Sequence, residues 1–148
     1  MLNYETHPSL KICIKSTDNG GNSKIANFTI SISNINEPAT IISLLPGWIH
    51  YVPDGFPAGS RVGSLQCDDP DIGDVCTFTL PSGIGDDNNL FRIEGSEIYT
   101  TEILHLPAGQ SYTIHVLARD KNDLGPEAQE FHLVVRDLND THMPLVYR

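Results

Sequence analysis

The stretch that decides the fold is YTIHVLARD, residues 112–120, in which apolar and polar side chains alternate. Alternation with a period of two is typical of a β-strand that buries one face. Residues 131–136, FHLVVR, alternate in the same way, and turn-forming residues between positions 120 and 126 separate the two stretches. The sequence therefore predicts two neighbouring strands, and no segment has the period of an amphipathic helix.

The same pair of strands occurs a second time near the start of the chain. Residues 10–18, LKICIKSTD, align with residues 112–120 at an offset of 102. Residues 28–37, FTISISNINE, align with residues 131–140 at an offset of 103. This period exceeds the ~50 residues of solenoid repeats, so it indicates tandem domains.

The repeat divides the chain into three parts. Residues 1–38 are the C-terminal part of one module with its linker, residues 39–140 are a complete module, and residues 141–148 lead to a following module. A module of about 100 residues with many short strands and Gly, Pro and Asp turns predicts an all-β sandwich. Two strands alone cannot bury a core, so residues 1–38 are expected to be a poorly stabilised β-hairpin from a truncated neighbouring module. The chain is thus expected to begin inside a domain.

The chain is acidic, with 19 Asp and Glu against 9 Lys and Arg and a net charge of −10. This charge repels phosphate backbones and anionic lipids, which argues against nucleic-acid binding and membrane contact. The carboxylates gather at strand ends, where loops supply the oxygens that calcium binds. Asp is also a common turn former, but recurrence in both copies favours calcium. The carboxylates are Glu5, Asp18, Glu37, Asp54, Asp68, Asp69, Asp71, Asp74, Asp120, Asp137 and Asp140.

Six short motifs, in the right order and spacing, resemble those of the cadherin extracellular repeat. They are LNYE at 2–5, the strand-end Asp18 and Asp120, NINEP at 34–38, DGFPAG at 54–59, DPD at 69–71 and DLNDTHMP at 137–144. The resemblance covers nearly the whole chain. It implies a seven-stranded Greek-key β-sandwich, with Ca²⁺ bound between consecutive modules.

The resemblance implies one calcium site between the two modules and another after the second. The first site would use Glu5, Asn36, Glu37, Asp69, Asp71 and Asp120, with Asn3 and Asn34 as neutral substitutes. The second site would use Asp54, Asp137, Asn139 and Asp140. His105 and Pro107 replace two of the family's carboxylates at this second site. We therefore do not expect the second site to fill.

The cysteines and one asparagine give further expectations. Cys67 and Cys76 flank the acidic loop on the inward phase of their strands, so a disulfide is favoured over two buried thiols. Cys13 is then left over. Asn27 begins a glycosylation sequon on the outward face of its strand.

The histidines give little support for zinc binding or catalysis. If residue 118 pairs with residue 129, His115 and His132 lie directly opposite each other on the outward face of the two strands. Two imidazoles leave a tetrahedral zinc ion two ligands short. No serine lies in a nucleophile motif, and no cysteine has an evident histidine partner. We therefore expect no enzymatic activity.

These observations lead to a functional hypothesis. The chain is expected to be an extracellular, calcium-rigidified module from the ectodomain of a plasma-membrane protein, acting in homophilic cell–cell adhesion. Its expected partners are neighbouring repeats in the same chain and another cadherin ectodomain in trans. The alternative is a calcium-stiffened spacer in a large secreted adhesin or matrix protein.

Overall fold

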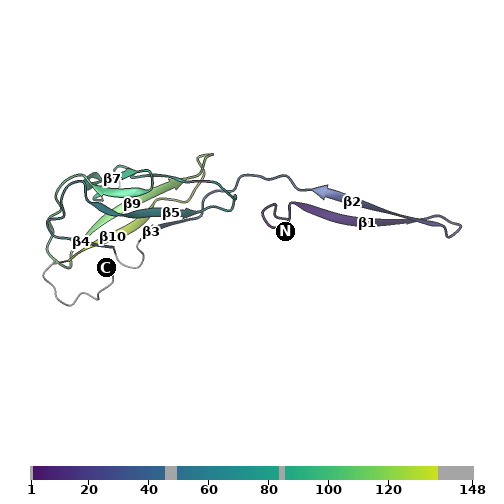
Figure 1. The fold of residues 1–148 in the computed structure, drawn as a ribbon, viewed down its shortest axis with the longest axis horizontal. Coiled ribbons are helices and arrows are strands. Elements are labelled where there is room, and N and C mark those ends of the chain that lie inside the picture. Colours follow the sequence, from purple (N-terminus) through teal and green to yellow (C-terminus); the bar gives the residue numbers. More distant parts are fainter. Residues whose placement is uncertain (1, 46–49, 84–85, 137–148) are drawn as a thin grey trace.

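The computed structural model describes residues 2–45, 50–83 and 86–136, and the regular secondary structure of these residues is β-strand apart from one short 3₁₀ turn. Two four-stranded sheets pack face to face, and a separate two-stranded hairpin extends from one end of them (Figure 1). The elements are β1 (Ser9–Thr17), β2 (Ser23–Ser31), β3 (Ile41–Leu45), β4 (His50–Pro53), β5 (Arg61–Asp68), β6 (Thr77–Thr79), the 3₁₀ turn η1 (Asn88–Leu90), β7 (Phe91–Glu94), β8 (Glu97–Thr100), β9 (Ser111–Arg119) and β10 (Gln129–Arg136). Among the described residues, no helix has the length and apolar character needed to span a bilayer.

The strand order confirms the predicted sandwich. One sheet has the order β3-β5-β8-β7, and the other has the order β4-β10-β9-β6. Strands β4 and β10 run parallel, while all other neighbours in the two sheets are antiparallel. The chain crosses between the sheets after β3, β4, β5, β6 and β8, and these crossings give the Greek-key arrangement.

The core lies between the two sheets and is made by the inward phase of each strand. Its fully buried side chains contribute roughly 1.5–3 kcal/mol each when they leave water. The largest of them are Ile42, Ile98, Leu104, Ile114, Leu133, Val52, Val116 and Val135. The alternation seen in residues 112–118 is reproduced as strict alternation between buried and half-buried side chains.

The hairpin β1–β2 has the same strand register as β9–β10. Leu10 pairs with Ile30, and Tyr112 pairs with Leu133, as the two repeat offsets require. The burial of the two hairpins differs sharply. Ile14 is 50% exposed, whereas Val116, which follows it by 102 residues, is 0% exposed. The same apolar face is therefore covered in the sandwich and open in the hairpin.

The pairing assumed for the two histidines was wrong by two residues. The register places Glu130 opposite His115 and Thr113 opposite His132, not the two histidines opposite each other. The cause is the irregular segment before β10. The Arg119 guanidinium donates to the Pro126 carbonyl in this segment, and the regular ladder begins only at Gln129.

The predicted disulfide is confirmed. Cys67 and Cys76 are bonded, their Cα atoms lie 6.4 Å apart, and both side chains pack against the core. This separation is within the range that a disulfide spans without backbone distortion. Cys13 is an exposed free thiol. The side chain of Asn27, where the glycosylation sequon begins, is also exposed.

Candidate metal centre

Acidic and amide side chains from separate segments gather at the end of the sandwich that faces the hairpin. The loop after β5 contributes Asp69 and Asp71, and the end of β9 contributes Asp120. The linker between β2 and β3 contributes Asn36 and Glu37, and it joins the hairpin to the sandwich (Figure 1). We call this group of side chains the junction.

Asp71 ties the linker to the sandwich. Its side chain is buried, with 4% of the residue exposed. One carboxylate oxygen accepts a hydrogen bond from the Asn34 amide at 2.7 Å, and the other accepts from the Glu37 backbone N–H at 2.8 Å. The loop itself is held by the Asp69 carboxylate, which accepts from the Asp71 N–H at 2.9 Å. The carboxylate of Asp71 is thus fixed between the two parts of the chain.

Asp120 uses its two oxygens for different purposes. Oδ1 closes the turn after β9 by accepting from the N–H groups of Asn122 and Leu124 at 2.7 and 2.8 Å. Oδ2 accepts from the Asn36 amide at 2.6 Å. Burial opposes ionisation of this carboxyl, but the hydrogen bonds from Leu124, Asn36 and Asn122 and the charge of Lys121 outweigh it, so the pKa of Asp120 lies below its ordinary value. Asp120 is therefore a carboxylate at neutral pH.

The first copy of the sequence repeat forms an equivalent turn at the tip of the hairpin, where Asp18 takes the place of Asp120. Asp18 Oδ1 accepts from the N–H groups of Gly20 and Asn22, both at 2.9 Å. The turn geometry is thus a property of the motif, and only the second copy places its Asp beside a linker.

Two groups of three carboxylates lie close enough together to hold a cation. Glu5, Glu37 and Asp71 form one group, and Asp69, Asp74 and Asp120 form the other. Within each group, one oxygen from every residue lies within 4.8 Å of the others. We call them the linker pocket and the loop pocket. All the charged residues predicted for the first junction lie in them, and Asn36 lies beside Asp120 in the loop pocket.

Unpaired acceptors show that these residues fit a cation. Five buried side-chain oxygens in the described part of the chain have no hydrogen-bond partner, and none of the five is a donor. They are Glu5 Oε1, Asn36 Oδ1, Glu37 Oε2, Asp69 Oδ2 and Asp74 Oδ2. A buried acceptor without a partner costs about 1–3 kcal/mol. Hard cations that take six to eight oxygen ligands, as calcium does, would satisfy all five if one were bound in each pocket.

Sequence reasoning did not assign Asp74 to the site. Its Oδ1 accepts from the Lys121 ammonium group at 2.7 Å. This bond, together with the charges of Asp74, Asp71 and Asp120, raises the pKa of Lys121 despite partial desolvation. The signal for Asp74 was the run of four carboxylates between residues 68 and 74. Lys121 gave no signal, because its proximity to Asp74 depends on how β6 and β9 pair.

Of the residues expected at the second site, the structure describes only Asp54, and it lies away from the junction. Asp54 follows β4 at the opposite end of the sheet and is exposed, and its carboxylate lies 3.4 Å from His105 Nδ1. Asp137, Asn139 and Asp140 lie outside the described residues. The structure therefore brings together the first set of predicted ligands, and of the second set it describes Asp54 alone.

The fold and the junction define a class of protein. Two sheets with this strand order form the Greek-key sandwich that the resemblance to the cadherin extracellular repeat implies, and the hairpin before them repeats the pairing of β9–β10. Comparisons with known proteins confirm the resemblance found in the sequence motifs.

No protein-family model matches the chain. Human protocadherin-16 is 31% identical to it over 149 residues, which is 97% of this chain and 4% of that protein. Mouse protocadherin-16 is 29% identical over the same share. The chain thus spans a very small part of the relatives that it matches.

Solved structures of cadherin repeats have the same fold. Human protocadherin-24 repeats EC1-2 match with a TM-score of 0.70 at 20% identity, covering 92% of this chain and 69% of that chain. The protocadherin gammaB7 EC3-6 cis-dimer matches with a TM-score of 0.71 at 16% identity, covering 95% and 35%. Drosophila N-cadherin EC1-4 matches with a TM-score of 0.70 at 17% identity, covering 90% and 36%. At these coverages the hairpin is matched together with the sandwich.

Proposed function

We propose that this chain spans the connection between two extracellular cadherin-type repeats in a protein that mediates cell–cell adhesion. Calcium at the junction would hold the two repeats together. Residues 1–38 are the final hairpin and linker of the first repeat, residues 39–140 are the second repeat, and residues 141–148 lead to a third. The open apolar face of β1–β2 supports this division, because its copy in β9–β10 is covered by the other sheet. The function is structural and adhesive, without enzymatic activity.

The observation that carries the calcium proposal is the set of five unpaired buried oxygens at the junction. Glu5, Glu37 and Asp71 would hold one ion, and Asp69, Asp74 and Asp120 would hold another, with Asn36 Oδ1 as a neutral ligand. When bound, calcium would supply the positive charge that joins the linker to the loop after β5. Six carboxylates at close range otherwise repel one another. The Lys121 ammonium group offsets only part of that repulsion.

Electrostatics connects this site to adhesion. Without a cation, repulsion between Glu37 on the linker and Asp71 on the sandwich loosens the connection between the repeats. With the charge neutralised, the Glu37 N–H bond to Asp71 and the Asn36 bond to Asp120 hold the linker in one position. A stiff array holds its outermost repeat at a fixed distance, and many weak contacts between opposed ectodomains then add by avidity.

Hydrogen exchange at the linker tests this proposal. Calcium is expected to slow exchange of the amides between residues 32 and 40, relative to the same protein in chelator. Asp69→Asn is the informative variant, because Asp69 makes none of the linker bonds described above but offers an unpaired oxygen to the site. It should lose the calcium effect, while Glu102→Gln, which removes an exposed carboxylate outside both pockets, should keep it. Equal exchange with and without calcium in the wild type would contradict the proposal.

A calcium-stiffened spacer without adhesive contacts is the second candidate. Two observations favour it: Asn34 is neutral in the linker, and His105, not a carboxylate, lies beside Asp54. Fewer charged ligands weaken calcium binding. Beads coated with the ectodomain that contains this segment separate the two candidates. Calcium-dependent clustering supports adhesion, and dispersed beads with intact calcium binding support the spacer.

A further inference from the structure

A row of acidic and histidine side chains runs across the outward face of β9 and β10, away from the junction. Asp86 Oδ2 lies 2.8 Å from His115 Nδ1, and His115 Nε2 lies 3.4 Å from Glu130 Oε2. The other oxygen of Glu130 lies 2.9 Å from His132 Nε2. His115 is five residues from Asp120, roughly 17 Å along an extended strand. This row of side chains is therefore separate from the linker pocket and the loop pocket.

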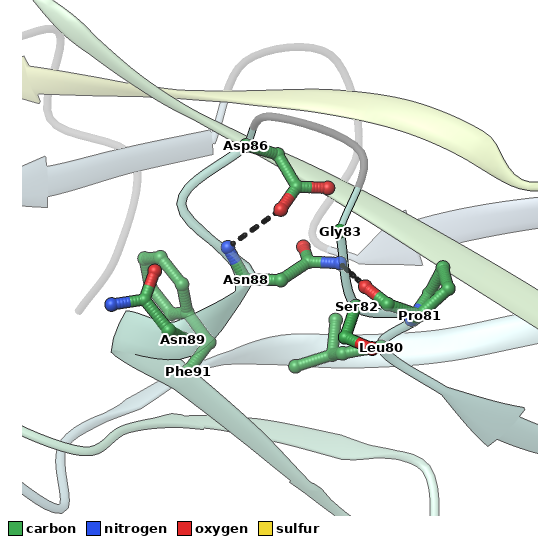
Figure 2. A pocket seen from close by; sticks show the side chains of 8 residues that line it. All are labelled: Leu80, Pro81, Ser82, Gly83, Asp86, Asn88, Asn89 and Phe91. Carbon is green, nitrogen blue, oxygen red and sulfur yellow. Dashed lines mark hydrogen bonds between the residues drawn. The ribbon is translucent and has the colours of Figure 1, made fainter.

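His115 is held in place by contacts with Asp86 and Asn88. The carboxylate of Asp86 is only 5% exposed, and it accepts a hydrogen bond from the Asn88 N–H at 3.2 Å (Figure 2). The Asn88 amide in turn bonds to both backbone groups of His115, at 2.9 and 3.0 Å, and to the Pro81 carbonyl at 2.8 Å. Asp86 therefore fixes both the orientation of the His115 ring and a proton on Nδ1, which leaves Nε2 pointing towards Glu130.

His132 has the same arrangement in a more exposed position. Its Nδ1 lies 3.2 Å from the Thr113 hydroxyl, and its Nε2 faces Glu130. Both imidazoles thus present Nε2 to one carboxylate and hold Nδ1 against an oxygen. Metal-bound histidines almost always have this second contact, because it sets the tautomer and orients the ring.

We propose that His115 Nε2, His132 Nε2 and the Glu130 carboxylate form a binding site for zinc or a similar divalent transition-metal ion. Two imidazoles and one carboxylate, with water in the fourth position, are an established tetrahedral zinc ligand set. Glu130 supplies the third protein ligand that the two histidines lacked. Calcium prefers oxygen ligands, so the site differs from the junction in metal preference as well as in position.

Binding requires the side chains of the site to move closer together. The two Nε2 atoms contact different oxygens of Glu130, and the three ligand atoms do not all lie within 4.8 Å of one another. The side chains of Glu130 and His132 are 51% and 58% exposed, so both are able to rotate towards the fixed His115 ring.

The test is a zinc titration of the 148-residue chain by calorimetry, at ~10 mM calcium so that the oxygen pockets are occupied. A Cys13→Ser background removes the exposed thiol, which would otherwise bind zinc. We expect one zinc ion per chain. His132→Gln should abolish binding, and its exposure means that the fold is retained. His105→Gln, which removes an exposed histidine outside this group, should leave binding unchanged.

A second variant and a spectroscopic readout distinguish zinc ligation from a structural role. Asp86→Asn keeps the shape of the side chain but removes its charge, and it should weaken zinc binding by about 10- to 100-fold. Nitrogen chemical shifts should show coordination through Nε2 of both His115 and His132. Absence of zinc binding, binding that survives His132→Gln, or coordination through Nδ1 would each overturn the proposal.

Discussion

Replacing Asp71 is the sharpest mutational test of the calcium junction. Its carboxylate belongs to the linker pocket, and it also accepts two of the hydrogen bonds that hold the linker. Asp71→Ala removes all three contributions at once. We therefore expect the variant to lose the stabilisation that calcium in the linker pocket gives to the folded protein.

The size of that stabilisation follows from binding linkage. With two neutral amides, Asn34 and Asn36, among the junction side chains, we expect a Kd of about 10⁻⁴–10⁻³ M, which is the range of extracellular calcium modules. At ~10 mM calcium, a site of this affinity stabilises the folded state by about 1.4 to 2.7 kcal/mol. For a domain of about 100 residues this corresponds to a rise in Tm of roughly 6 to 11 °C.

Differential scanning calorimetry, with and without calcium, measures this rise directly. Each variant is compared with its own calcium-free Tm, so the packing lost with the Asp71 side chain cancels. Glu102→Gln is the matched control and should retain the full rise. Asp86, which lies in a loop without a motif, is unsuitable as a control, because its carboxylate is buried and hydrogen-bonded. A wild-type rise that persists undiminished in Asp71→Ala would refute the assignment of the site.

Three further predictions concern the disulfide, the hairpin and the lysine of the loop pocket. Replacing Cys67 and Cys76 by Ser should reduce the free energy of unfolding by about 2.5 kcal/mol in denaturant titrations. An unchanged free energy of unfolding would contradict this expectation. The double variant should also bind calcium more weakly, because the disulfide closes the acidic loop. A peptide of residues 1–38 should be largely unstructured in water, since two strands cannot bury a core, and dispersed, protected amide signals would show otherwise. Lys121→Gln should raise calcium affinity, by up to about fivefold, because it frees the Asp74 carboxylate from a half-exposed ion pair. Lower affinity in this variant would mean that the ammonium group supports the site.

The fold could be predicted from the sequence because the repeat and the alternation are local signals. The offsets of 102 and 103 align β1 with β9 and β2 with β10, and the structure gives the two hairpins the same register, with Leu10 opposite Ile30 and Tyr112 opposite Leu133. The separate guess for the histidines failed because it counted from the turn, where the irregular segment before β10 hides the true start of the ladder. The exposure of the hairpin's apolar face also follows from the sequence, since two strands alone cannot bury a core.

The site was predictable only where motifs carried it. Asp69, Asp71 and Asp120 stand at strand ends in recognisable patterns, and the structure brings them to one end of the sandwich. The Lys121 bond to Asp74 and the group formed by Asp86, His115 and Glu130 depend instead on tertiary packing of distant segments. No spacing in the sequence encodes such contacts.

The most direct test of the central claim is a calcium titration followed by backbone amide chemical shifts. The signals of Glu37, Asp71 and Leu124 should move together, because their N–H groups bond to junction carboxylates. The shifts should saturate with a Kd of about 10⁻⁴–10⁻³ M. They should stay at the junction, with no comparable change at residues 54–59. Amides that do not move through ~10 mM calcium, well above the expected Kd range, would contradict the account, as would shifts centred away from the junction.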